Sequence, residues 1–103
     1  MSTLIMSTVG LQLRELREKS GLSLRKAAVL ADIDIAILSK MERGERKLTK
    51  ELIIRLSEIY NCKPDHLIIN FLSEKVVYEL KDEEFGLKAL KMAEQKIRYN
   101  KAI

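Results

Sequence analysis

The stretch Gly21–Gly44, GLSLRKAAVLADIDIAILSKMERG, decides the fold, because its pattern predicts two short helices in close succession. Ser23 offers a side-chain oxygen as the N-cap of a helix over about residues 24–30. Asp34 can likewise cap a helix over residues 35–43, and Gly44 can take the left-handed conformation that ends this helix. Only a tight turn remains between the two helices.

Apolar residues recur at helical spacing on both sides of this stretch. A preceding helix, capped by Ser7 or Thr8 and ended by Gly21, has a stripe with the spacing i, i+4, i+7. A following helix has the same spacing between Thr49 and about Asn61. The two stripes consist of Val9, Leu13 and Leu16, and of Leu52, Leu56 and Ile59.

Further helices are predicted in the last part of the chain. Pro64 fits the first turn of a fifth helix, and apolar residues every four positions favour one long helix to about Leu80. The run Lys75–Leu80 is also β-branched enough for a short strand. Asp82 is expected to cap a last helix, which gives an all-α fold.

Composition limits the domain organisation and the environment. With 103 residues, 47% hydrophobic and 33% charged, the chain has the size and composition of one folded domain with an appended helix pair. The net charge of +4 is compatible with a nucleic-acid partner. Cys62 is the single cysteine, which excludes an intrachain disulfide and fits a reducing cytoplasm. No apolar run approaches the roughly 20 residues of a membrane span.

Residues that resemble catalytic or stacking groups have simpler explanations. His66 is the only histidine, so neither a metal-ligand cluster nor a Ser/His/Asp arrangement can be drawn, and we expect an exposed residue in the first turn of a helix. Glu83 and Glu84 are adjacent, and a helix start attracts acidic residues. Three dispersed tyrosines suit core or interface packing better than base stacking: Tyr60, Tyr78 and Tyr99. We therefore expect no enzymatic activity, metal or cofactor.

Several short motifs together resemble the Cro and phage-repressor class of bacterial helix-turn-helix regulators. They are Leu16-Arg17, Gly21-Leu22-Ser23, Ala27-Ala28 and the run from Leu38 to Arg46, LSKMERGER. The resemblance covers about Thr8–Leu72 and implies a lambda-repressor-like five-helix DNA-binding domain with an additional C-terminal helix. The expected organisation is a DNA-binding domain over residues 1–72, ordered from about residue 8, and a helical extension over residues 73–103.

The resemblance implies that residues 35–43 form the recognition helix, with Leu38 and Met41 on the side that packs against the protein. Lys40 can donate to guanine, Ser39 can pair with several bases, and apolar side chains can contact a thymine methyl group. The expected base contacts are Ile35, Ala36, Ser39 and Lys40. For Ile35 and Ile37, burial against the protein is the alternative.

Phosphate contacts are expected around the recognition helix. Residues 40–50 hold five basic and two acidic side chains, and the start of the helix after Ser23 presents free amides and a positive dipole end. The candidates are Ser23, Leu24, Arg25, Arg43, Arg46 and Lys47. Arg17 and Glu42 match a pair that forms an internal ion pair in related repressors, and we predict that contact here.

The segment after residue 72 carries apolar residues that something must cover. The segment either folds back on its own domain or pairs with a second chain, and a two-fold DNA site favours the homodimer, because it needs two recognition helices about 34 Å apart. We expect a cytoplasmic transcriptional repressor that binds double-stranded DNA as a homodimer. The alternative is a protein-interaction module, antitoxin-like, with weak or absent DNA binding.

Overall fold

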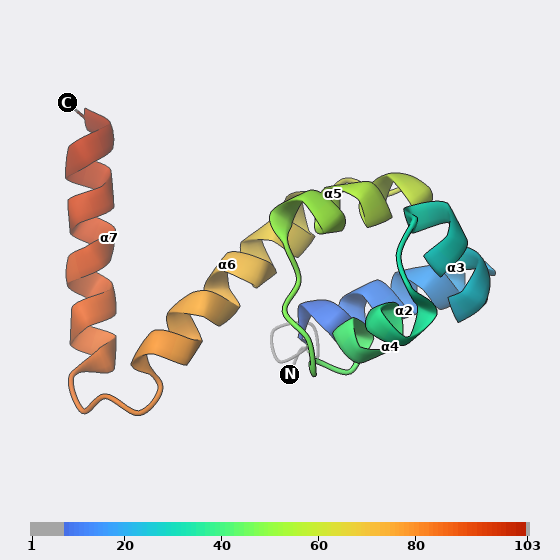
Figure 1. Ribbon diagram of the computed structural model, residues 1–103. Coiled ribbons are helices and arrows are strands. Elements are labelled where there is room, and N and C mark those ends of the chain that lie inside the picture. The colour runs from blue at the N-terminus through green and yellow to red at the C-terminus, as the bar shows by residue number, and fades with distance from the viewer. Residues whose placement is uncertain (1–7, 103) are drawn as a thin grey trace. The chain divides into compact units, whose positions relative to one another are not determined.

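The computed structural model describes residues 8–102, which contain six helices and no strand (Figure 1). The predicted all-α fold is confirmed, with α2–α6 as the five-helix set and α7 as the additional C-terminal helix. The tail expected before residue 8 lies outside the described residues. The helices are α2 Val9–Lys19, α3 Leu24–Ala31, α4 Ile35–Glu42, α5 Lys50–Ile59, α6 Asp65–Leu80 and α7 Gly86–Ala102.

Four helices begin at the predicted N-cap residues. Thr8 Oγ1 accepts a hydrogen bond from Leu11 N over 3.1 Å in α2, and Thr49 Oγ1 accepts one from Leu52 N over 3.2 Å in α5. Ser23 and Asp34 cap α3 and α4 in the same way. These side chains satisfy backbone N–H groups that have no acceptor within the helix.

The turn between α3 and α4 depends on one residue in the left-handed region. Asp32 has φ 57° and ψ 47° and forms the C-cap of α3. Aspartate tolerates this conformation better than most residues, because its short polar side chain can bond locally. Arg55 of α5 stabilises the end of α3, since its Nη1 donates to the Ala31 carbonyl oxygen over 2.7 Å.

The apolar stripes predicted for α2 and α5 form the core. Val9, Leu13 and Leu56 are at most 1% exposed, and Ile53 and Ser57, which lie outside the predicted stripe, are also fully buried. The remaining buried apolar residues come from α3, α4, α5 with its C-cap residue, and the start of α6: Ala27, Ala28, Ala31, Leu38, Met41, Leu52, Tyr60 and Leu67.

The long-helix interpretation of the C-terminal region is confirmed, because α6 runs unbroken to Leu80, and the strand alternative for Lys75–Leu80 is wrong. Pro64 lies just before the helix rather than within its first turn, and its carbonyl oxygen accepts from Ile68 N over 2.9 Å. His66 is exposed in the first turn, as predicted.

The predicted cap of the last helix is wrong. Asp82, like Glu83 and Glu84, lies before α7, which begins only at Gly86. A Cβ atom at position 86 would lie 2.6 Å from the Leu80 carbonyl oxygen. The chain therefore needs glycine at the start of α7, where it passes close to the end of α6.

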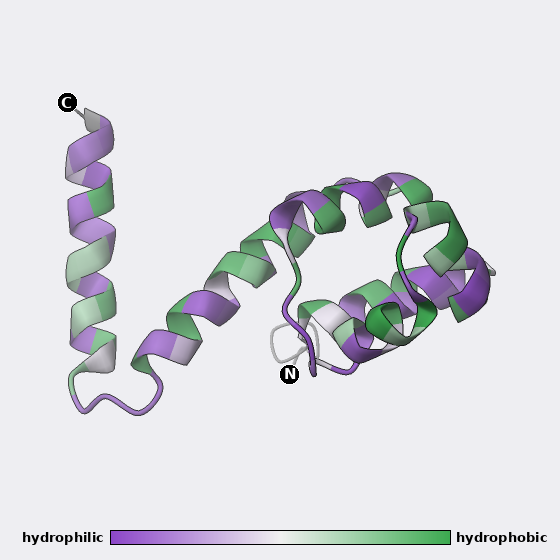
Figure 2. Ribbon diagram, viewed as in Figure 1, coloured by the Kyte–Doolittle hydropathy of each residue, from purple (hydrophilic) through white to green (hydrophobic). Residues whose placement is uncertain are grey.

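The chain divides into two compact units, one ending at Leu72 and the other beginning at Ser73. The second unit exposes much apolar surface, and α7 carries hydrophobic residues among hydrophilic ones along its length (Figure 2). Within residues 8–102, no helix combines the length and hydrophobicity that a bilayer crossing needs. The exposed large apolar residues of the second unit are Val76, Val77, Tyr78, Phe85, Leu87, Leu90, Met92, Ile97 and Tyr99.

Candidate nucleic-acid interface

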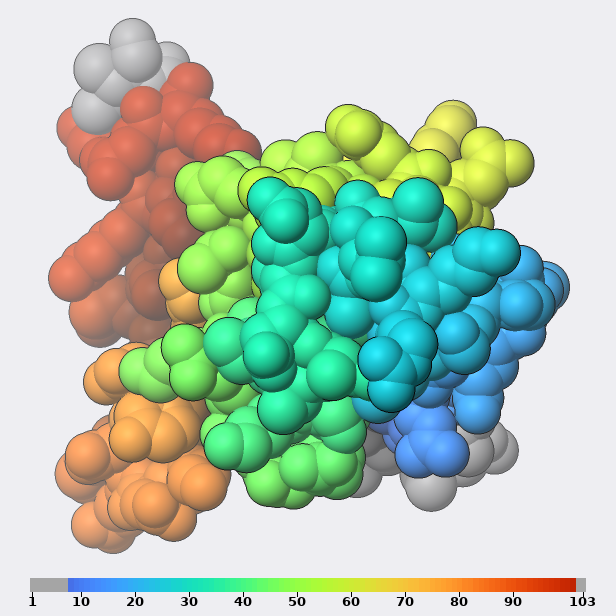
Figure 3. Space-filling view, turned by 45° about the vertical axis from the view of Figure 1, so that its right-hand side comes forward, coloured from blue at the N-terminus to red at the C-terminus, as the bar shows by residue number. Residues whose placement is uncertain are grey.

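The inner side of α4 fixes this helix to the core. Leu38 is fully buried and Met41 is 8% exposed, as the sequence predicts. The helix contacts α2 and α3, and in the space-filling view α3 and α4 lie side by side on one face of the first unit (Figure 3). On the opposite side of α4, Ala36 and Lys40 are exposed.

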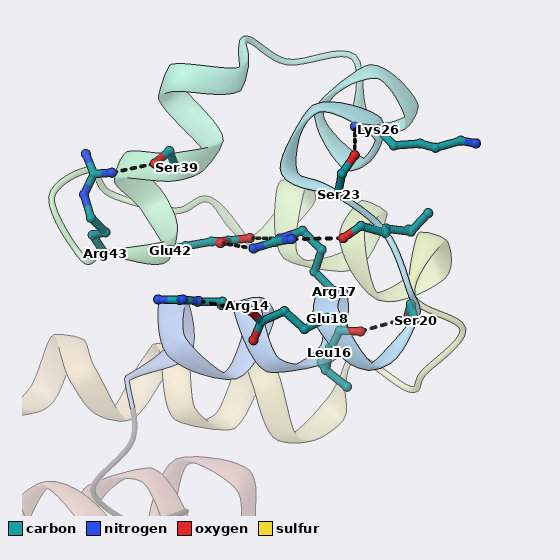
Figure 4. A network of polar contacts seen from close by, with 11 residues as sticks. Arg14, Leu16, Arg17, Glu18, Ser20, Ser23, Lys26, Ser39, Glu42 and Arg43 are labelled. Atoms are coloured by element: carbon teal, nitrogen blue, oxygen red, sulfur yellow. Dashed lines mark hydrogen bonds and ion pairs between the residues drawn. The ribbon is translucent and has the colours of Figure 1, made fainter.

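An ion pair between α2 and the end of α4 strengthens this attachment (Figure 4). Arg17 Nε lies 2.8 Å from Glu42 Oε2, and Nη2 lies 3.1 Å from Oε1, so the pair is bidentate. Arg17 Nη1 also donates to the Leu22 carbonyl oxygen over 2.9 Å. The two side chains are only 11% and 5% exposed. One guanidinium thus joins α2, the turn before α3, and α4, and the hydrogen bond to Glu42 raises the pKa of Arg17.

A glycine to which the sequence pattern assigned no function lets α2 approach α4 so closely. A Cβ atom at Gly10 would lie 2.3 Å from the Met41 carbonyl oxygen and 2.8 Å from that of Glu42. A glycine inside an apolar helical pattern is a weak signal for such an approach, because glycine otherwise destabilises helices. The sequence alone does not say which backbone comes near.

The other positions of α4 differ in their exposure and in their contact with the core. Ala36 and Lys40 are exposed, and Ser39 is half-buried. Ile35 and Ile37 are also half-buried, and both pack against the core. This packing favours the burial alternative for the two isoleucines and leaves Ala36, Ser39 and Lys40 as the outward-facing groups.

The starts of α3 and α4 differ in charge. At α3 the neutral hydroxyl of Ser23 accepts from Lys26 N over 3.1 Å, and the amides of Leu24 and Arg25 have no acceptor within the helix. At α4 the Asp34 carboxylate accepts from Ala36 N over 2.7 Å and from Ile37 N over 3.3 Å. A carboxylate already occupies the positive end of α4, so α3 is the better place for an anion.

Basic side chains follow α4 directly. Arg46 and Lys47 are exposed in the segment between α4 and α5, as is Arg25 at the start of α3, whereas the Leu24 side chain packs against the core. Arg43 is exposed too, but it contacts Ser39 and Glu45 within the chain. The sequence pattern gave no function to Glu45 or Arg55, because a charged residue on an outward face resembles any solvated charge.

Tyr60 is a buried residue of the same region whose hydroxyl has no hydrogen-bond partner among residues 8–102. Burial, and then the charge of Glu42, raises the pKa of Tyr60 to about 12 from its ordinary value of 10.0. The other two tyrosines, Tyr78 and Tyr99, are exposed.

Tyr60→Phe is expected to leave the free energy of unfolding unchanged or to raise it by up to about 1 kcal/mol, because the buried hydroxyl finds no hydrogen-bond partner within residues 8–102. The unfolded chain releases the phenolic proton at a lower pH than the folded chain, so the wild type should lose about 2 to 3 kcal/mol between pH 10 and 12. The variant should lack this part of the loss. Urea unfolding at several pH values checks both points, and equal alkaline losses in the two proteins would contradict the second.

Comparisons with known proteins agree with this architecture. A family model described as "Helix-turn-helix" matches residues 13–67. The HTH-type transcriptional regulator ImmR of Bacillus subtilis (strain 168) is 29% identical over 90 residues, covering 75% of this chain and 71% of ImmR.

Three solved structures share the fold. The clp gene regulator ClgR from Corynebacterium glutamicum superposes with a TM-score of 0.57 at 22% identity, covering 88% of this chain and 83% of ClgR. A hypothetical protein from E. coli superposes with a TM-score of 0.62 at 22% identity, covering 82% of this chain and 87% of the other. A chain of the SinR protein/SinI protein complex superposes with a TM-score of 0.56 at 17% identity, covering 93% of this chain and 100% of the other. With α3 and α4 forming the two helices of the motif and the family model spanning more than half of the sequence, the chain belongs to the helix-turn-helix family, in agreement with its resemblance to the Cro and phage-repressor class.

Proposed function

We propose that the protein is a sequence-specific DNA-binding transcriptional regulator that inserts α4 into the major groove. One observation carries the proposal: α4 is fixed on its inner side by buried contacts and by the pair of Arg17 with Glu42, while its outer side presents short and polar groups. A helix that reads bases needs this combination, because the reading side chains must be held in a constant position.

Base readout is assigned to the outward groups of α4. Lys40 is exposed and can donate to guanine O6 or N7, Ser39 can bond to a base edge, and Ala36 can contact a thymine methyl group. Ile35 can contribute only the part of its side chain that the core leaves exposed. Lys40 is therefore the principal candidate for direct readout.

Phosphate binding is assigned to the surroundings of α4. The free amides of Leu24 and Arg25 after the Ser23 cap form an anion site at the start of α3, and the side chains of Arg25, Arg46 and Lys47 add positive charge. These contacts fix the orientation of the protein on the duplex but do not discriminate between sequences.

The protein acts, in this proposal, as a homodimer on a two-fold operator, where it represses transcription in the cytoplasm. The apolar residues of α7 support a dimer, because Leu87, Met92 and Ile97 are between 57% and 78% exposed in the single chain. The names of two similar proteins, transcriptional regulator ImmR and clp gene regulator ClgR, support the regulatory function.

Selection of bound sequences from a random pool of duplex DNA tests this function. We expect enriched sequences with two-fold symmetry and half-sites centred about 34 Å apart or a multiple of that distance. Enrichment of single half-sites would contradict the dimer but not base readout. No enrichment over random duplex would contradict the proposed function.

Two variants, one of a lysine and one of an arginine, distinguish base contacts from phosphate contacts. Lys40→Ala is expected to lose discrimination at one base pair of each half-site, worth about 1 to 3 kcal/mol, because a base-specific donor is removed. Arg46→Ala should weaken binding to all sequences and reduce the slope of log K against log salt by about 0.9 per subunit. Fluorescence anisotropy titrations at several salt concentrations measure both effects. If the two variants behave alike, the assignment of these residues is wrong.

A protein-interaction module is the second candidate function. The exposed apolar residues of α7 favour it, as does the similarity to a chain of the SinR protein/SinI protein complex, an assembly of two different proteins. In that case, binding to specific and random duplex should not differ in the anisotropy titrations.

A further inference from the structure

Arg43 connects the recognition helix to an acidic residue just beyond it. Its Nε donates to Glu45 Oε2 over 2.6 Å, and Nη2 lies 3.5 Å from Glu45 Oε1. Its Nη1 donates to Ser39 Oγ over 2.5 Å, a contact that Figure 4 shows. One guanidinium therefore joins a candidate base contact to a carboxylate.

The contact with Arg43 restricts the hydrogen bonding of Ser39. A guanidinium has only donors, so the Ser39 oxygen must be the acceptor in this pair. Its own proton then points to another acceptor. A serine hydroxyl alone can donate to or accept from a base, whereas this one is biased toward donating, which suits guanine O6 or N7, adenine N7 or thymine O4 and disfavours cytosine N4.

Glu45 also affects how strongly Arg43 can attract DNA. The hydrogen bonds from Arg43 hold the pKa of Glu45 below its usual value, so the carboxylate is charged at neutral pH. While the pair persists, the positive charge of Arg43 is balanced. If Arg43 moved to a phosphate, the uncompensated carboxylate would remain beside the DNA backbone and oppose binding.

We propose that Glu45 is a positioning residue for DNA specificity: it holds Arg43 against Ser39, which keeps the serine oriented as a donor to a base, and it withholds Arg43 from the phosphate contacts. This inference rests on the proposed function, base reading by α4. It also changes the expected function of Arg43: instead of binding a phosphate, Arg43 orients the side chain of Ser39.

Glu45→Gln tests the inference, because glutamine keeps the shape but removes the charge that holds Arg43. Affinity for random duplex should rise about 3- to 10-fold, and the salt slope should steepen by about 0.9 per subunit as Arg43 becomes a phosphate ligand. Affinity for the selected site should rise less, and selection should show weaker preference at the base pair that faces Ser39.

Three further variants complete the design. Arg43→Ala and Ser39→Ala should each weaken preference at that same base pair, with the salt slope unchanged. Glu58→Gln on α5 makes the same change in net charge at another exposed glutamate and should alter neither slope nor preference. Because Glu45 and Arg43 are each more than half exposed, Glu45→Gln should melt like the wild type.

The outcomes separate this inference from the proposed function. If the wild type does not discriminate between selected and random duplex, base reading itself fails. If the wild type discriminates but Glu45→Gln keeps its salt slope and base preference, only the inference is overturned. It is also overturned if Glu45→Gln strengthens binding to both duplexes equally without changing the preference, since Glu45 would then act only through general charge.

Discussion

Glu42→Ala is expected to lower the free energy of unfolding by about 3 to 5 kcal/mol, one of the two largest effects of a single substitution here. The variant leaves Arg17 with its hydrogen bond to Leu22 but without its ion pair to Glu42, although its side chain is only 11% exposed. An isolated charge in such a position keeps its desolvation cost without the compensating interaction. Urea unfolding followed by far-ultraviolet circular dichroism measures the loss.

A matched control lies on the same helix. Arg14 and Glu18 form an i,i+4 pair with 3.6 Å between Arg14 Nε and Glu18 Oε2, and both side chains are 54% exposed. Glu18→Ala should therefore change stability by less than about 0.5 kcal/mol. The double variant Arg17→Met/Glu42→Leu should recover much of the loss, since it removes both buried charges. A Glu42→Ala protein as stable as Glu18→Ala would show that the buried pair contributes nothing.

Gly10→Ala should destabilise the protein by about 2 to 3 kcal/mol, although alanine is the better helix former. The added methyl group would lie 2.3 Å from the Met41 carbonyl oxygen, a backbone atom that can move only with the end of α4. Helix propensity alone predicts a gain of about 0.5 to 1 kcal/mol, so the two explanations differ in sign. Thermal and urea unfolding give that sign directly.

A second glycine provides the comparison for Gly10. Gly44 has φ +76°, and a methyl group added there would meet no atom of residues 8–102 within 4 Å, so Gly44→Ala should cost about 1 kcal/mol through backbone strain alone. Gly10→Ala should also weaken DNA binding beyond its effect on stability, because it displaces the end of α4. A Gly10→Ala protein more stable than the wild type would refute the close approach of α2 and α4.

Much of the fold follows from local signals in the sequence. Thr8, Ser23, Asp34 and Thr49 each cap a helix where a short polar side chain precedes an apolar stripe, since capping depends on neighbouring residues alone. Asp82 has the same local signal but does not cap α7. That helix begins only at Gly86, where the backbone passes close to the Leu80 carbonyl oxygen, a spatial contact that a local capping signal does not report.

In the candidate site, the contacts that the family pattern specifies could be predicted from the sequence. The contacts between exposed side chains could not. The pairing of Arg17 with Glu42 links residues 25 positions apart, and only the resemblance to related repressors pointed to it. The contact of Arg43 with Glu45 had no such guide, because any exposed basic residue near the recognition helix suits a phosphate. Half-burial of Ile35 likewise depends on how α4 tilts against the core.

The guanidinium of Arg17 has a consequence for the dynamics of the whole domain. Because it bonds at once to Glu42 and to the Leu22 carbonyl, α4 cannot detach from the core by local opening without breaking contacts that also hold the preceding helices. The backbone amides in the second half of α4 should then exchange with solvent only through global unfolding. In the proposed function, α4 would therefore meet DNA already ordered, so that little conformational entropy is lost on binding and the helix does not deform to fit a mismatched base pair.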